Sequence, residues 1–221
     1  MARGRSADWA PNRESIVRTA AALFAQQGYP GTSMSDLARA CGVSKPLLYH
    51  YVDDKYRLLL EITEGHVNRL AALVAEIEAL PLAPQERLRQ LIGRFVQEYA
   101  DARHDHGVLT QDVKFLESAD RKRVLGVERR VVAAFAGAIV QARPELARAA
   151  LDKPLTMLLF GMINWMFTWL RPDGAIAPAQ MAPIVADLFL GGLGAVQAPP
   201  GAKRSVKARS AIVDRSVDNT T

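Results

Sequence analysis

The chain has 221 residues, a formal net charge of +5, 49% apolar residues and a single cysteine. A chain of this length can bury a substantial core, either as one large domain or as a small domain beside a larger one. One cysteine excludes an internal disulfide framework. With neither a bilayer-length apolar run nor an apolar signal segment at its start, we expect a cytoplasmic protein without a membrane partner.

The positive charge is concentrated at the two ends of the chain. Residues 1–60 carry eight Lys or Arg against five Asp or Glu, and residues 198–221 carry five against two. Residues 61–197 carry fifteen against sixteen. A basic N-terminal part beside a neutral body is the distribution expected where one end of a protein faces nucleic acid.

The first predicted elements are an arm and a helix. Residues 1–11 predict a flexible basic arm, which is either plain disorder or a segment that enters the DNA minor groove. Asn12 is the expected N-cap of a helix whose apolar residues recur at helical spacing until Gly28 ends it. Tyr29-Pro30-Gly31 then predicts a turn.

Residues 34–53, MSDLARACGVSKPLLYHYVD, predict two short helices joined by a tight turn. Gly42 can take the left-handed conformation that ends the first helix, and the small Ala38 allows the two helices to cross closely. Ser33 or Thr32 caps the first helix, and Asp36 completes a capping box with Ser33. The free N–H groups at this helix start would also suit a DNA phosphate.

The second short helix is predicted from about Lys45 to Tyr51, with Ser44 as its N-cap. If Leu48 and Tyr51 pack inward, the outward face carries a cation, a phenol, an imidazole and two apolar groups. This mixture suits base edges and phosphates together, whereas the alternative is an ordinary helical hairpin with an exposed polar face. The outward residues are Lys45, Pro46, Leu47, Tyr49 and His50.

Residues 16–60, which contain GYPGTSMSDLARACGVSKPLLYHYVDDKYRLL, resemble the DNA-binding domain of the TetR family of bacterial repressors. The resemblance implies a homodimer that inserts its recognition helix into the major groove of double-stranded operator DNA, and a small-molecule pocket in the C-terminal domain. By position it assigns Lys55 to a phosphate contact. The bulky segment Pro46-Leu47-Leu48 departs from the small residues common there, so the operator sequence does not follow from the resemblance.

Together, the motif and the resemblance define an expected DNA-binding set at the N-terminal end of the chain. Its members are Thr32, Ser33, Ser44, Lys45, Pro46, Leu47, Tyr49, His50 and Lys55.

A long helix from about Lys55 to Ala79 is predicted to link two domains, and a further helix ends near Tyr99. The segment His104-Asp105-His106 offers metal-binding side chains. However, adjacent residues point in different directions and no suitable partner lies at helical spacing. Since Gly107 favours a polar loop, we expect neither a metal site nor a cofactor.

Two more helices are predicted from Val108 to Ser118 and from Arg121 to Ala142. The second one is rich in basic residues, which form either a solvated face or a contact with an anionic ligand. These residues are Arg121, Lys122, Arg123, Arg129 and Arg130.

Residues 155–170, LTMLLFGMINWMFTWL, are apolar on every side of the predicted helix, so the helix must be covered all round. Sixteen residues are short for a membrane span, which favours a buried interface helix. Together with residues 178–190, which Gly191-Gly192-Leu193-Gly194 should end, it would form a four-helix contact with a second copy of the chain. Ile163 and Phe167 are the expected interface residues.

No strand-like alternation or long repeat is present, and the predicted fold class is therefore all-α. We expect a basic arm at 1–11, a three-helix helix-turn-helix domain at 12–60, a larger ligand-binding and dimerisation domain at 61–197 and a disordered basic tail at 198–221. A helical enzyme or carrier is the alternative, but no activated nucleophile, acid–base pair or metal set supports one. A ligand-responsive regulator, most simply a repressor of a pseudo-palindromic operator, is favoured.

The expected effector cavity lies among aromatic and methionine side chains, each of which would serve equally well as core. They are Phe95, Tyr99, Phe115, Met162, Trp165, Met166 and Trp169. The segment FGMINWMFTWLRPDG resembles TetR-family members that respond to CoA thioesters of fatty, aromatic or steroid-derived acids, which implies an acyl-CoA effector that releases DNA. The alternative is a TetR-type repressor of efflux genes that senses cationic drugs.

Overall fold

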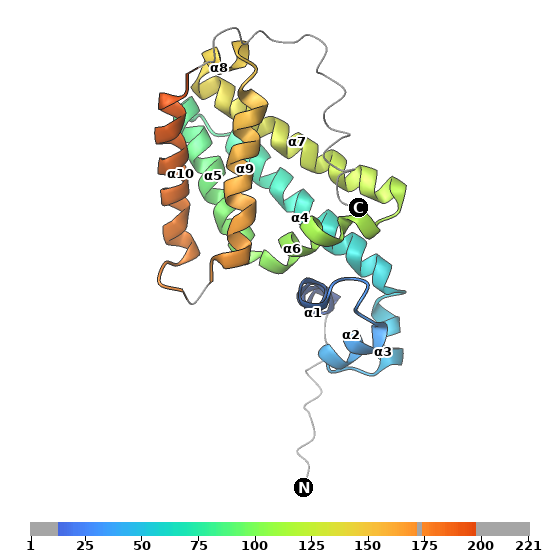
Figure 1. The fold of residues 1–221 in the computed structure, drawn as a ribbon. Helices are drawn as coiled ribbons and strands as arrows, with labels where there is room; N and C mark the ends of the chain where they lie inside the picture. Colours follow the sequence, from blue (N-terminus) through green and yellow to red (C-terminus); the bar gives the residue numbers. More distant parts are fainter. Residues whose placement is uncertain (1–12, 172–173, 198–221) are drawn as a thin grey trace.

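The computed structural model describes residues 13–171 and 174–197, apart from the side chain of Phe167, and its regular structure there is entirely helical (Figure 1). The predicted all-α fold class is confirmed. The predicted arm, the Asn12 cap and the C-terminal tail lie outside the described residues. The elements are α1 Arg13–Gln27, α2 Met34–Ala40, α3 Lys45–Tyr51, α4 Lys55–Glu78, α5 Pro84–Asp101, α6 Arg103–Asp112, the 3-10 turn η1 Val113–Phe115, α7 Ser118–Ala142, α8 Pro144–Arg148, α9 Asp152–Trp169 and α10 Pro178–Ala195.

Helices α1, α2 and α3 form a small domain at one end of the molecule, and its apolar core also includes residues of α4, α6 and α7 (Figure 1). Ile16, Phe24 and Leu48 are completely buried in this core. The chain turns sharply after α1 and after α2 because Gly28 and Gly42 adopt φ angles of 74° and 67°. These left-handed conformations are accessible to glycine without a Cβ clash, as the sequence predicts.

Side-chain caps hold the two short helices of this domain, which have seven residues each and would not be stable alone. The Ser33 hydroxyl accepts a hydrogen bond from the backbone N–H of Asp36, and the Asp36 carboxylate accepts one from the N–H of Ser33 at 3.1 Å. The Ser44 hydroxyl accepts from the N–H of Leu47 at 3.3 Å. Both predicted N-caps are therefore confirmed.

Helix α4 connects the small domain to the rest of the molecule (Figure 1). Its 24 residues span about 36 Å at the α-helical rise. Leu58 and Ile62 in its first half are buried in the N-terminal core, whereas Leu70 and Ile77 in its second half are buried in the C-terminal core. A displacement of this helix therefore changes the packing of both cores.

The C-terminal domain consists of α5 to α10 around a second core. Phe95 of α5, Phe135 of α7 and Phe160 of α9 meet edge to face at its centre, with ring centroids 4.7 and 4.9 Å apart along this series. Helix α10 packs along α5, and α7 packs against both α4 and α9. None of the described helices is both long and apolar enough to cross a membrane.

The segment around α6 differs from the prediction. We predicted a polar loop at Gly107 and a helix from Val108, but α6 begins before both residues and ends in the turn η1. Gly107 lies buried inside α6, which packs against α1 and α4. This packing outweighs the roughly 1 kcal/mol that a glycine costs inside a helix. Helix α7 also starts earlier than predicted, at Ser118 rather than at Arg121.

The predicted helix stop at Gly191-Gly192-Leu193-Gly194 is wrong, because α10 continues to Ala195. Leu193 within this segment is buried and forms part of the C-terminal core. The guanidinium of Arg143 donates to the carbonyl of Leu193 at 2.6 Å and to that of Val196 at 3.3 Å. Core packing and a cation at the helix end thus stabilise a segment whose composition favours termination.

Candidate DNA-binding surface and effector cavity

The outward face of α3 is exposed at the tip of the small domain. Leu48 is fully buried, and this residue fixes which side of the helix faces solvent. Leu47 and Tyr49 are large side chains that are 40% and 45% exposed without an apolar neighbour to cover them. The exposed residues of α3 are Lys45, Pro46, Leu47, Tyr49 and His50, preceded by the exposed cap Ser44. They present donors, acceptors and apolar groups on one surface.

Two residues of the expected DNA-binding set, one in the turn between α1 and α2 and one at the start of α4, hold this turn through hydrogen bonds. Thr32 is buried, and its hydroxyl donates to the carbonyl of Gly28 at 3.0 Å. The ammonium of Lys55 donates to the carbonyls of Tyr29 and Thr32, both at 2.9 Å, and lies 4.4 Å from the centre of the Tyr29 ring. Sequence position could not show this, since the carbonyls lie more than twenty residues away in the chain. Ser33 remains exposed beside this turn.

The same turn is attached to the C-terminal domain through α6. The carboxylate of Asp112, at the end of α6, accepts a hydrogen bond from the backbone N–H of Tyr29 at 3.1 Å. Phe115 packs its ring against Tyr29, with centroids 5.7 Å apart. Burial raises the pKa of Asp112, and the N–H of Tyr29 is its hydrogen-bond donor. The orientation of the small domain therefore depends on the position of α6.

A second junction lies where α4 and α7 begin. The Tyr56 hydroxyl donates to the carboxylate of Asp120 at 2.6 Å and accepts from the backbone N–H of Glu117 at 3.1 Å. This pair of bonds fixes the start of α4 against the start of α7. Helices α4 and α6 thus contact the small domain, and α7 contacts the start of α4, which connects the small domain to the rest of the molecule.

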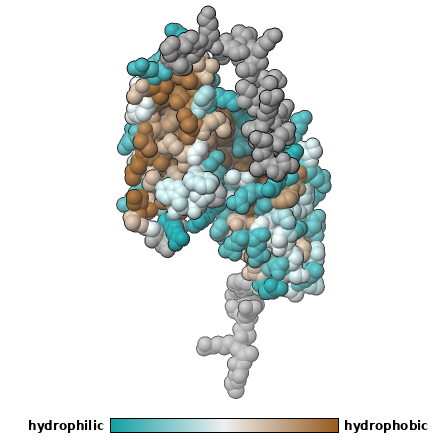
Figure 2. All heavy atoms as spheres, viewed as in Figure 1, coloured by the Kyte–Doolittle hydropathy of each residue, from teal (hydrophilic) through white to brown (hydrophobic). Residues whose placement is uncertain are grey.

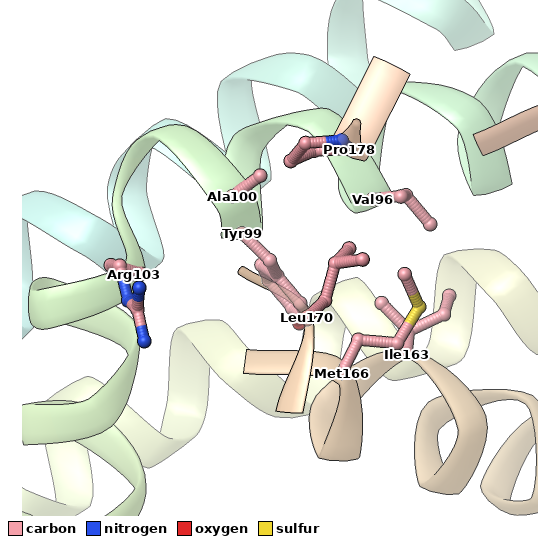
Figure 3. Close-up of a pocket in the computed structure, with 8 residues that line it drawn as sticks. All are labelled: Val96, Tyr99, Ala100, Arg103, Ile163, Met166, Leu170 and Pro178. Carbon is pink, nitrogen blue, oxygen red and sulfur yellow. The ribbon is translucent and has the colours of Figure 1, made fainter. Parts of the chain in front are cut away.

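The C-terminal domain contains a small gap between α5, α9 and the start of α10 (Figure 3). Ile163, Met166 and Leu170 face Val96 across it, whereas the charged end of Arg103 lies to one side (Figure 3). Its volume is about 20 Å³. Since a single water needs roughly 10–15 Å³, the gap has room for a water but not for an effector.

A tenfold larger cavity, of about 200 Å³, lies deeper between α4, α5, α6, α7 and α9. One side chain, Met157 of α9, lines the cavity and is also 50% exposed, so the cavity reaches the surface beside α9. The walls are mainly apolar but include a carboxyl, an amide and an imidazole. The lining residues are Val67, Leu70, Tyr99, His106, Leu109, Thr110, Val113, Glu128, Val131, Val132, Met157, Phe160 and Asn164.

Two buried histidines join α4 and α6 at the wall of this cavity. The Nε2 atom of His66 lies 3.2 Å from the Nδ1 atom of His106, and the His106 ring stacks on Tyr99 with centroids 3.8 Å apart. Burial lowers the pKa of His66 to about 3 and that of His106 to about 4. Both imidazoles are therefore neutral near pH 7, so that one can donate to the other.

An ion-pair cluster lies next to this histidine pair. The guanidinium of Arg69 on α4 pairs with Glu98 of α5 at 3.0 Å and with Asp105 of α6. The positive charge of Arg69 adds to the lowering of the His66 pKa, after burial and the neighbouring His106. The segment around Gly107, for which we predicted a polar loop, is thus part of α6, and its residues Asp105 and His106 contribute to the contacts that join α4, α5 and α6.

The expected convergence of seven aromatic and methionine residues on one cavity is wrong. Phe95 is enclosed by other phenyl rings in the core, and Phe115 packs on Tyr29 of the small domain. Trp165 and Trp169 are 68% and 52% exposed. Helical periodicity explains the split, since they occupy the side of α9 opposite the one that the core covers. Met162 is only packed at the edge of the core, Met166 lines the small gap, and Tyr99 lines both spaces.

The sequence interpretation missed the polar residues of the large cavity. A signal for them was present, because each interrupts an apolar stripe at helical spacing. Glu128 lies four residues after Val124 and three before Val131, both of which are buried. Asn164 is the amide in the otherwise apolar segment of α9. A polar residue within a buried stripe requires a partner or a function.

Exposed apolar side chains gather on α9 and α10, where Figure 2 shows a continuous hydrophobic area along one edge of the molecule. Leu158, Trp165 and Leu188 are each 64–68% exposed. Ile163, which we expected at a subunit interface, is instead fully buried in the core of its own domain, and the side chain of Phe167 lies outside the described part. An apolar area of this extent is typical of a protein interaction surface.

The exposed recognition surface, the hollow helical domain and the helices that join them define a ligand-responsive DNA-binding regulator. Residues 16–62 match the model of bacterial regulatory proteins of the tetR family, and residues 81–193 match that of the tetracyclin repressor-like C-terminal domain. The chain belongs to the TetR family of transcriptional regulators. It is a DNA-binding transcription factor and not an enzyme.

Individual relatives extend over most of the chain. A TetR-family regulator of known structure from Bordetella parapertussis is 36% identical, with 85% of this chain and 98% of that chain covered and a TM-score of 0.77. The HTH-type transcriptional repressor KstR2 of Rhodococcus jostii is 28% identical over 185 residues, which cover 82% of this chain and 90% of that protein.

A third similar structure is AibR in complex with isovaleryl coenzyme A and operator DNA. It is 24% identical, covers 80% of this chain and 96% of that chain, and has a TM-score of 0.69. At this identity the comparison shows a shared fold.

Proposed function

We propose that this repressor binds a pseudo-palindromic operator as a homodimer and releases it when an acyl-CoA thioester fills the large cavity. The observation that carries the proposal is that the same two helices wall the cavity and hold the DNA-binding domain. Val67 and Leu70 of α4 line the cavity, as do Leu109 and Thr110 of α6. Two residues further along α6, Asp112 binds the turn of the small domain. A group that enters the cavity and displaces α6 would therefore move that turn.

The DNA contacts divide between bases and phosphates. Lys45 and Leu47 lie on the exposed face of the recognition helix and would meet base edges, and Tyr49 would hold a phosphate. We assign Lys55 a different role from the one expected, because its ammonium already holds the carbonyls of Tyr29 and Thr32. It would keep α2 and α3 in place rather than contact the backbone of DNA.

The homodimer follows from the geometry of half-sites. A single recognition helix covers one half-site, and two half-sites lie about 34 Å apart, one helical turn of DNA. The apolar area on α9 and α10 is the surface that a second copy would cover, through Leu158, Trp165 and Leu188. Such a dimer would act in the cytoplasm, where the operator DNA of a bacterium lies.

The acyl-CoA assignment is supported by the size of the cavity and by exposed basic residues on α7, one of the helices that line it. At about 200 Å³ the cavity is smaller than the roughly 300–1,000 Å³ of sites that enclose a drug-sized ligand. It would take the acyl group and leave the nucleotide outside. Arg129 and Arg130 are exposed on α7, on the same helix as the cavity residues Glu128 and Val131, and would meet the phosphates. Arg123 is less suited, since it is ion-paired with Glu64 and Asp120.

Names of similar proteins agree with this ligand class. AibR, which shares the fold, has been crystallised with both isovaleryl coenzyme A and operator DNA. A KstR2 of similar fold is described as a ketosteroid transcriptional regulator.

The test measures operator release against a panel of free acids, their CoA thioesters and cationic drugs. The wild-type protein should release operator DNA with thioesters and not with the free acids. Asp112→Ala should still bind the thioester, as measured by calorimetry, but should need at least about tenfold more of it for release, since it loses a hydrogen bond worth roughly 1–3 kcal/mol. Asp101→Ala, which removes an exposed carboxylate of α5, is the matched control. Release by cationic drugs alone would contradict the proposal.

A further inference from the structure

The large cavity combines apolar walls with two polar side chains to which none of the other described residues forms a hydrogen bond. Most lining residues are aliphatic or aromatic, and the hydroxyl of Thr110 already donates to the carbonyl of His106 at 2.8 Å. Glu128 and Asn164 differ from these residues. They come from α7 and α9, helices that pack against each other, and both line the same space.

Glu128 is a carboxyl group in an apolar setting. It forms neither a hydrogen bond nor an ion pair with any other described residue, although the exposed Arg129 follows it in the chain. Burial raises the pKa of Glu128, and its charge in turn helps to raise the pKa of Tyr99, so the two side chains lie near each other. A buried carboxyl group is costly unless a partner donates to it or it takes up a proton.

Asn164 presents a second unsatisfied group. Its Oδ1 atom is buried and has no hydrogen-bond partner among the described residues. Buried amide oxygens are almost always paired, so an atom without a donor among the described residues is a place where a bound molecule can donate. Since Asn164 lines the cavity, a molecule inside the cavity can supply it.

We propose that Glu128 and Asn164 form a polar subsite for a hydroxyl group on the acyl part of the effector, so that the repressor responds to hydroxylated acyl-CoA thioesters. This inference rests on the proposed function. A hydroxyl group donates one hydrogen bond and accepts others, so it can donate to the Oδ1 atom of Asn164 while it accepts a hydrogen bond from the protonated carboxyl group of Glu128, the form that burial favours. A keto group offers no donor to the amide oxygen.

The other walls specify the rest of the acyl group. Met157, Phe160 and Val131 line the same cavity and would contact hydrocarbon. A primary ammonium group would also donate to both polar residues. The uncharged hydroxyl is favoured, because burial raises the pKa of Glu128 and so favours its neutral form, which would not offset the charge of an ammonium group between apolar walls.

The experiment compares matched pairs of thioesters that differ in one hydroxyl group. The probes are cyclohexanecarboxyl-CoA and octanoyl-CoA, each beside a counterpart with a hydroxyl group at the end farthest from the thioester. For the wild-type protein, the hydroxylated member of at least one pair should release operator DNA at a concentration at least about tenfold lower. An equal response to both members of each pair would overturn the subsite and leave the acyl-CoA function standing. No response to any thioester would overturn the proposed function itself.

Variants then test the two residues. Asn164→Leu keeps a similar side-chain volume without the amide, and Glu128→Met keeps a similar side-chain length without the carboxyl group. Each should reduce the preference for the hydroxylated probe to within about twofold, because the preference depends on both hydrogen bonds. Asn68→Leu and Glu78→Met make the same chemical changes at exposed positions of α4 and should keep the wild-type preference. Retention of the preference in both cavity variants would contradict the assignment. For any variant that no longer binds DNA, calorimetry measures the affinities for the two members of each thioester pair directly.

Discussion

The proposed recognition surface and the proposed effector cavity are built in opposite ways. The recognition surface consists of neighbouring residues on the seven-residue helix α3, and its side chains point into solvent. The cavity combines residues from five helices, among them Val67, Tyr99, His106, Glu128 and Asn164. A substitution on α3 therefore changes one contact with DNA, whereas a substitution in the cavity also changes the packing of helices against one another.

Two polar side chains link the turn between α1 and α2 to α4 and α6, in addition to the apolar contacts of the shared core. Lys55 holds the turn between α1 and α2 from α4, and Asp112 holds it from α6. Both residues bind backbone atoms of the turn rather than the recognition helix itself. The conformation of the turn therefore determines where α3 points, and ligand binding can alter DNA affinity without a change in any residue that contacts DNA.

The largest expected effect comes from breaking the apolar surface that would bring two recognition helices together. Leu158→Asp combined with Leu188→Asp places charges where a second copy should bind, so we expect monomers in sedimentation at micromolar concentration. Operator affinity should fall by roughly 100-fold or more, because the second half-site contact is lost.

Two controls separate this effect from misfolding. Leu80→Asp changes an exposed leucine outside α9 and α10 and should remain dimeric. Ile163→Asp should instead lose its fold, since Ile163 is fully buried in the core. A Leu158→Asp, Leu188→Asp protein that still sediments as a dimer would place the interface elsewhere.

The second prediction concerns pH and the two buried histidines that join α4 to α6. Both buried histidines have a pKa below the ordinary value of 6.5, about 3 for His66 and about 4 for His106. Between pH 6.5 and 4 the unfolded chain binds protons that the folded chain does not, so the free energy of unfolding should fall as pH is lowered. Two protons correspond to a slope of at most about 2.7 kcal/mol per pH unit.

Urea unfolding at a series of pH values measures this slope. His66→Gln should reduce it by about half, since one of two protons is removed. His50→Gln, on the exposed face of α3, is the matched control and should keep the wild-type slope.

The raised pKa of Glu128 acts in the opposite direction and weakens stability as pH rises above 4.5, so Glu128→Gln should steepen the slope. A slope that His66→Gln leaves unchanged would contradict the assignment to the buried pair.

The smallest expected effects concern two lysines. Lys45 would contact bases, whereas Lys55 would hold the recognition helix in place. Lys45→Ala should cost about 1–3 kcal/mol of operator affinity and relax base preference, because it removes a direct contact. Lys55→Met should weaken operator and random DNA by the same factor and lower the melting temperature, because two backbone carbonyls lose their donor.

Salt titration provides the decisive measurement for Lys55. If this lysine only supports the turn, Lys55→Met should leave the dependence of log affinity on log salt unchanged. A decrease of about one in the slope would instead show that Lys55 neutralises a phosphate, as the family resemblance implies. The same titration of Tyr49→Phe, which keeps the exposed ring but removes the hydroxyl, tests the phosphate contact proposed for Tyr49.

The amino-acid sequence by itself determined the all-α class and the helix-turn-helix motif. The signals for this motif act within a few residues of one another, which is why they can be read without the fold. Gly42 permits the turn through its own backbone conformation, and Ser33 and Ser44 cap helices that begin at the next residue. The exposed face of α3 then follows from helical periodicity once Leu48 is placed inside.

Only the tertiary structure decided where the cavity lies and which side of each C-terminal helix is covered. Ile163 and Trp165 are both apolar and two positions apart, yet one is buried in its own domain and the other is mostly exposed. Periodicity cannot distinguish a face that packs internally from a face that awaits a second copy, because both require apolar residues. Likewise, Glu128 and Asn164 are far apart in the chain, and their shared cavity exists because α7 packs against α9.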